Sequence, residues 1–72
     1  MPATYRMRMT KYELMSHLFS PMNLQNTLLL PDGERAYVQT VQKEDGGAKT
    51  FNLTVCVLST NKAVGVFVRT TD

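Results

Sequence analysis

The side chains best suited to nucleophilic catalysis are His17 and Cys56, the single histidine and the single cysteine of the chain. A cysteine nucleophile is activated by a base within hydrogen-bond reach. Helical spacing places His17 on the polar side of its predicted helix, whereas strand alternation turns Cys56 away from that helix. We therefore expect the two not to meet, and we predict that the protein is not an enzyme.

Four carboxylates lie in predicted turns: Asp32, Glu34, Glu44 and Asp45. A general acid needs surroundings that raise its pKa, and nothing apolar flanks these groups. One histidine and one cysteine cannot complete a structural zinc site. The Gly46-Gly47 pair lacks the helix and lysine that follow a phosphate-binding loop. The sequence thus predicts no catalytic residues, no metal and no cofactor.

The secondary-structure pattern is clearest in the C-terminal half, where residues 36–70 are predicted to form a β-meander. Three runs, 36–42, 51–58 and 63–69, are rich in β-branched and aromatic residues and are bounded by turn formers. We place the hairpin tips at Asp45-Gly46 and Thr60-Asn61.

Strand alternation gives this meander two different faces, because side chains repeat with period two. The predicted apolar face, which something must cover, consists of Ala36, Val38, Thr40, Phe51, Leu53, Val55, Val57, Val64, Val66 and Val68. The other face is mixed, with Tyr37, Thr54 and Phe67 in one predicted cross-strand row. The next row holds Gln39, Asn52 and Arg69, and Cys56 is placed beside Gly65.

The first ten residues alternate apolar and basic side chains, with Tyr5, Met7 and Met9 on one side and Arg6 and Arg8 on the other. This pattern predicts a half-buried edge strand, since arginines on an edge discourage aggregation. A basic, unpaired N-terminal arm is the alternative.

A capping box, Thr10-Lys11-Tyr12-Glu13, predicts that a helix starts at residue 10. Its apolar stripe consists of Leu14, Met15, Leu18 and Phe19, and the helix should end near Phe19 because Pro21 follows. The sequence does not decide whether a short second helical turn follows at residues 20–25. Residues 28–30 favour a brief strand, and Pro31-Asp32-Gly33 favours a turn.

Length and composition limit which folds are possible for this chain. The 72 residues fit one domain, 1–72, and the lone cysteine excludes an internal disulfide and suits a reducing, cytoplasmic compartment. The longest apolar run, 28–30, is too short to cross a membrane, and the N-terminus lacks the apolar core of a signal peptide. We predict an α+β domain in which one amphipathic helix packs on a three- to five-stranded antiparallel sheet with a C-terminal meander.

The mixed face suggests a function based on binding. An exposed sheet with aromatic and arginine side chains is typical of a protein interface. We therefore predict an unidentified protein partner or a second copy of the chain, as in phage- or plasmid-type accessory or inhibitor proteins. The predicted contact residues are Tyr37, Gln39, Thr54, Phe67 and Arg69.

Single-stranded nucleic acid is the alternative partner, because aromatic side chains on a sheet can stack unpaired bases. Tyr37 and Phe67 would stack. The candidate nucleic-acid contacts are Arg6, Arg8, Lys11, Arg35 and Lys43. The net charge of +2 does not by itself indicate a nucleic-acid-binding protein.

Overall fold

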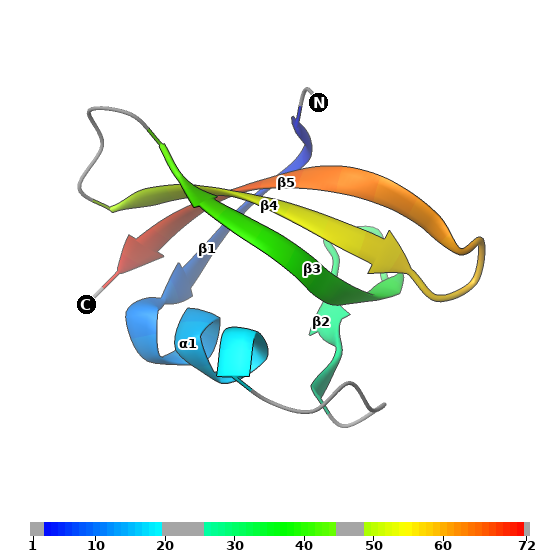
Figure 1. Cartoon of the computed structure of the whole chain (residues 1–72), viewed down its shortest axis with the longest axis horizontal. Coiled ribbons are helices and arrows are strands. Elements are labelled where there is room, and N and C mark those ends of the chain that lie inside the picture. The colour runs from blue at the N-terminus through cyan, green and yellow to red at the C-terminus, as the bar shows by residue number, and fades with distance from the viewer. Residues whose placement is uncertain (1–2, 20–25, 45–48, 72) are drawn as a thin grey trace.

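The computed structural model describes residues 3–19, 26–44 and 49–71. Its elements in chain order are β1 (Ala3–Thr10), α1 (Lys11–Phe19), β2 (Leu28–Leu29), β3 (Arg35–Lys43), β4 (Thr50–Val57) and β5 (Lys62–Thr71). The strands form one sheet in the order β1-β5-β4-β3-β2. This sheet curls into a half-barrel, and α1 lies under its concave side (Figure 1).

The sheet is mixed, which corrects the prediction of an antiparallel one. The β2–β3, β3–β4 and β4–β5 pairs are antiparallel, but β1 pairs in parallel with β5. β1 is an edge strand, as predicted from the alternation of its side chains. That alternation, however, does not indicate which strand pairs with β1. The single helix and the C-terminal meander are confirmed, although with one nine-residue helix the domain is mostly β.

Helix α1 begins as the capping box predicts. The backbone N–H of Glu13 donates to Thr10 Oγ1 at 3.0 Å, which satisfies one of the amides that the first turn leaves unpaired. The helix covers the valine-rich face, also as predicted. Its stripe is only partly packed, however: Leu14 is 3% exposed, whereas Met15 is 51% exposed.

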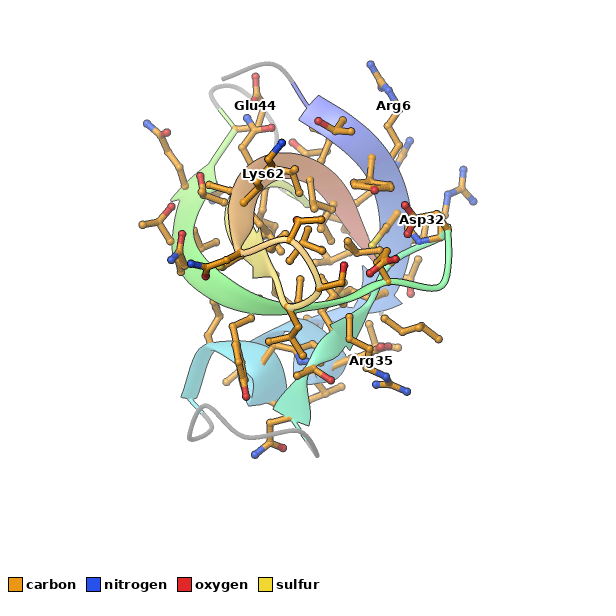
Figure 2. The ribbon with its side chains drawn as sticks, turned by 90° about the vertical axis from the view of Figure 1, so that its right-hand side faces the viewer. Arg6, Asp32, Arg35, Glu44 and Lys62 are labelled. Carbon is orange, nitrogen blue, oxygen red and sulfur yellow. The ribbon has the colours of Figure 1, made fainter. Side chains whose placement is uncertain are left out.

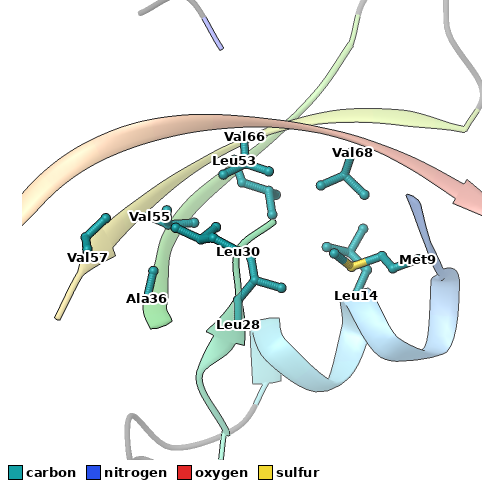
Figure 3. Packing of buried hydrophobic residues seen from close by; sticks show 10 residues of the cluster. All are labelled: Met9, Leu14, Leu28, Leu30, Ala36, Leu53, Val55, Val57, Val66 and Val68. Atoms are coloured by element: carbon teal, nitrogen blue, oxygen red, sulfur yellow. The ribbon is translucent and has the colours of Figure 1, made fainter. Parts of the chain in front are cut away.

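The core fills the concave side of the half-barrel (Figure 3). It combines the inward-facing residues of β3, β4 and β5 with Met9 from β1 and Leu14 from α1. Leu28 in β2 and Leu30, which directly precedes the β2–β3 turn, close the remaining side. The buried hydrophobic residues are Met9, Leu14, Leu28, Leu30, Ala36, Leu53, Val55, Val57, Val66 and Val68.

The partners across the hairpins differ from the prediction by two positions. Val38 lies opposite Val55 instead of Leu53, and Val64 lies opposite Val55 instead of Val57. A shift of two residues preserves which face a side chain occupies, so the inner valines stay inside. The second hairpin has a four-residue loop, 58–61, whose last residue, Asn61, has φ 57°.

A β-bulge in β3 changes the faces beyond it. The register shifts between Val38 and Thr40, so that Gln39 is the extra residue. Thr40 then pairs with Thr54 on the outer face, and Val41 pairs with Leu53. The placement of Thr40 on the apolar face was therefore wrong. The predicted tip at Asp45-Gly46 and the helical turn at 20–25 lie outside the described residues.

One hydrogen bond draws together opposite ends of the strand order. The Tyr5 hydroxyl on β1 donates to Asp32 Oδ2 in the β2–β3 turn at 2.5 Å. Asp32 Oδ1 also accepts from the Glu34 N–H at 3.1 Å. The hydrogen bond from Tyr5, followed by that from the Glu34 amide, lowers the pKa of Asp32, and the bond to Asp32 raises the pKa of Tyr5.

This contact predicts a stability difference that depends on pH. The lowered pKa means that Asp32 stabilises the fold above its unfolded pKa and that this contribution disappears as pH falls through its folded value. The raised pKa of Tyr5 gives stability below the unfolded value that is lost as pH rises through the folded one. We expect Tyr5→Phe to be less stable than the parent near pH 7 and to differ less from it below about pH 4 and above about pH 10.

Urea unfolding of both proteins across this pH range measures the difference directly. An equal difference at every pH would show that the hydroxyl–carboxylate bond does not carry the effect.

Candidate functional site

The outer, convex face of the sheet is organised in cross-strand rows. Arg6, Phe67, Asn52 and Gln42 form one row across β1, β5, β4 and β3. Arg8, Arg69 and Thr50 form the row on one side of it. On the other side lie, in order, the row of Gly65, Thr54 and Thr40, and the row of Ala63, Cys56 and Tyr37.

Three arginines gather at one end of this face. Arg6, Arg8 and Arg69, with Phe67 between them, are called here the arginine cluster. The Arg6 guanidinium carbon lies 5.3 Å from the centroid of the half-buried Phe67 ring, a cation–π contact. These four residues and Met7 line a cavity of about 300 Å³.

Among the described residues, no carboxylate pairs with the charges of the cluster. Within residues 3–19, 26–44 and 49–71, no ion pair joins any of its three guanidinium groups to a carboxylate. Figure 2 shows Arg6 pointing away from the interior of the half-barrel. A second cavity of about 350 Å³ continues past Arg8 and Arg69 and is bordered by Lys49, Thr70 and Thr71. This end of the face is therefore an accessible positive surface with one aromatic ring.

Beside the cluster lies a hollow without charged lining, called here the polar hollow. It has a volume of about 280 Å³. Gly65 leaves space at its floor because it has no side chain, and the bulge in β3 turns Thr40 and Gln42 toward it. Its lining residues are Thr40, Gln42, Asn52, Leu53, Thr54, Gly65 and Val66.

One carboxylate lies next to the hollow. The side-chain amide of Asn52 donates to Glu44 Oε2, so that Glu44 fixes the orientation of the amide. Asn52 is half-buried and Glu44 is half-buried as well. The sequence pattern gave no signal for the hollow, because it depends on the bulge and on residues from three strands.

The predicted protein-contact residues share the outer side but not the predicted rows. Tyr37 pairs with Cys56, two rows from Phe67, a separation of roughly 15 Å from strand spacing and rise. Gln39 lies at the bulge and is exposed. Thr54 borders the polar hollow and Arg69 belongs to the arginine cluster. The predicted row of Tyr37, Thr54 and Phe67 is therefore wrong.

The predicted nucleic-acid contacts are divided between several places. Arg6 and Arg8 join the cluster, whereas Arg35 Nη1 contacts Thr27 Oγ1 at 3.3 Å. Lys43 pairs with Phe51, and Lys11 is the first residue of α1. Lys11 also borders an apolar cavity of about 400 Å³, lined otherwise by Leu14, Met15, Leu18, Lys49, Phe51 and Thr70.

His17 and Cys56 lie on opposite sides of the sheet. His17 Nδ1 is 3.3 Å from the carbonyl oxygen of Asn26, and Cys56 Sγ donates to Asn61 Oδ1 at 3.3 Å. Among the turn carboxylates, Glu34 accepts a hydrogen bond from Ser59 Oγ at 2.6 Å. Asp45 lies outside the described residues.

The described part of the chain contains no group of three or more histidine, cysteine, aspartate or glutamate side chains that could hold a metal ion. It also contains no helix with the length and apolar character needed to cross a bilayer.

The arginine cluster and the polar hollow are thus adjacent features of one face, one cationic with an aromatic ring and one neutral and hydrogen-bonding. Comparisons with protein-family models, with curated proteins and with solved structures find no match to this chain.

Proposed function

We propose that this protein binds single-stranded nucleic acid through the arginine cluster and does so without catalysing a reaction. The observation that carries the proposal is the gathering of Arg6, Arg8 and Arg69 around Phe67 on an open sheet face. Arginine forms bidentate, charge-assisted hydrogen bonds with phosphate oxygens. Three such groups, which pair with no carboxylate in the described part of the chain, form a surface suited to a polyanion.

Phe67 and Arg6 supply the contact for bases. A base can stack on an aromatic ring or on a guanidinium plane, and the two lie together here. Unpaired bases expose their faces, whereas bases inside a duplex do not. This combination favours a single strand over a double helix.

The salt dependence of oligonucleotide affinity tests the proposal. Binding of a fluorescent single strand, followed by anisotropy, should weaken with salt with a log–log slope of about −2, because three phosphate contacts contribute about 0.7 each. Arg69→Gln should reduce the magnitude of that slope by about 0.7 and weaken binding.

Arg35→Gln is the matched control, because it removes the same charge from a guanidinium that contacts Thr27 instead. It should leave the slope nearly unchanged. The absence of binding at low salt, or equal losses in Arg69→Gln and Arg35→Gln, would refute the proposal.

Protein binding or dimer formation through the same face stays a prediction, and Tyr37 separates it from the nucleic-acid proposal. Tyr37 lies two rows from the arginine cluster. Tyr37→Ala should therefore leave oligonucleotide affinity unchanged. A solution mass of twice the monomer, lost in Tyr37→Ala, would instead support a homodimer that uses this end of the face.

A further inference from the structure

We infer that the polar hollow accepts one nucleobase of the bound strand and contacts it through hydrogen bonds. The inference rests on the proposed function and adds the part of the ligand that this second feature recognises. The hollow has about 280 Å³ of space, and none of the described residues that line it is charged. A phosphate would gain no cation there, whereas an uncharged, planar, hydrogen-bonding group would be matched.

The lining side chains provide the required chemistry. Gln42 and Asn52 carry amides, which both donate and accept, and Thr40 and Thr54 carry hydroxyls, which do the same. Donor and acceptor groups of this kind recognise the edges of unstacked bases. The Asn52 amide donates a hydrogen bond to Glu44, so the orientation of this amide is fixed before a ligand binds.

The position of the hollow fits the path of a strand held by the arginine cluster. Gly65 at its floor is two residues from Phe67 on β5, about 7 Å along the strand. Asn52 connects the two features, since it lines the hollow and pairs with Phe67 of the arginine cluster. A nucleotide whose phosphate contacts the cluster therefore has its base within reach of the hollow.

The β-bulge is the structural device that makes the hollow. Without the extra residue Gln39, regular alternation would turn Thr40 inward and leave Val41 facing outward. Bulges commonly redirect side chains beside functional sites. Here the bulge replaces an apolar side chain on the outer face by a hydroxyl and an amide.

Filling the hollow tests the inference. Gly33 is the described glycine with a positive φ, so a side chain at Gly65 meets no left-handed backbone. The variant Gly65→Val should fill the space, and Thr54→Val should remove one hydroxyl at nearly constant volume. Each is assayed with a single-stranded oligonucleotide and with an abasic strand of the same length and charge.

For the parent protein we expect the base-bearing strand to bind at least about fivefold more tightly than the abasic strand. Gly65→Val and Thr54→Val should each reduce this ratio severalfold and leave both abasic affinity and salt slope unchanged. Thr50→Val is the matched control, because Thr50 lies on the same strand and face but does not line the hollow. It should preserve the ratio, and far-UV circular dichroism checks that all variants are folded.

The experiments distinguish failure of the base contact from failure of the proposed function. A ratio unchanged in both Gly65→Val and Thr54→Val overturns the base contact in the hollow, while the salt slope and the Arg69→Gln effect still support the proposed function. A ratio near one in the parent overturns both the contact in the hollow and base stacking on Phe67, and leaves only phosphate binding by the arginine cluster. Binding to neither strand overturns both proposals.

Discussion

Leu53→Ala is expected to remove a large part of the free energy of unfolding of this protein. Leu53 is 2% exposed and lies in the middle of the inner face, between Val41 on β3 and Val66 on β5. Truncation of a buried leucine to alanine costs about 2–5 kcal/mol, because transfer free energy is lost and a cavity remains. A domain of this length has a free energy of unfolding of only about 4–11 kcal/mol.

Urea denaturation followed by far-UV circular dichroism measures this loss as a lower midpoint. The matched control is Leu58→Ala, the same substitution at a leucine in the β4–β5 loop that is 38% exposed. It should cost less than about 1 kcal/mol. Similar midpoints for the two variants would contradict the assignment of Leu53 to the centre of the core.

Gly33→Val is expected to be the most damaging single change outside the core. Gly33 has φ +89°, and no atom lies within 4 Å of where its Cβ would be. Any loss therefore comes from the backbone, at about 1–2 kcal/mol for an L-residue in this conformation, and a β-branched side chain is among the worst suited.

The backbone origin of the effect predicts an order among variants. Gly33→Asn should be the mildest, because asparagine tolerates the left-handed region, Gly33→Ala should be intermediate, and Gly33→Val should be the worst. Thermal denaturation of the three proteins gives the order. A loss that increases with side-chain size, with Gly33→Ala the mildest, would instead indicate steric crowding, which the open space around this position does not predict.

Gly33 also explains why this turn could be predicted from sequence. The Gly33 N–H donates to the Leu30 carbonyl at 2.9 Å, and the Leu30 N–H donates to the Glu34 carbonyl at 2.7 Å, which closes a three-residue hairpin loop. Pro31, Asp32 and Gly33 each have the conformational preference that such a loop requires. The Thr10 cap was predictable for the same reason, since its hydrogen bond spans three residues.

Features that depend on long-range pairing were not predictable in this way. The valine alternation assigned the inner face correctly, because parity survives a two-residue shift in register. The alternation could not reveal the bulge at Gln39, since the sequence of a bulged strand does not differ from that of a regular strand with a polar residue at that position. The predicted aromatic row failed because the partners of Tyr37 and of Phe67 on β4 each differ by two residues from those that the tightest turns would give.

The arginine cluster shows the same limit for the candidate site. Arg6 and Arg8 were recognised as a basic strip and Arg69 as part of the mixed face, but they were assigned to different surfaces. They meet only because β1 pairs in parallel with β5, a contact between residues about sixty positions apart that no local pattern encodes.

The same β1–β5 pairing also sets the order in which the domain can be completed. β1 has β5 as its only neighbour in the described sheet, so residues 3–10 cannot be seated until residues 62–71 have been synthesised. Pairing β1 with β5 closes a long loop, and the entropy cost of that closure slows the step. The meander can form first through its local hairpins. During translation, the alternating Met and Arg segment emerges before the other strands and remains unpaired until β5 follows, which exposes it to premature association.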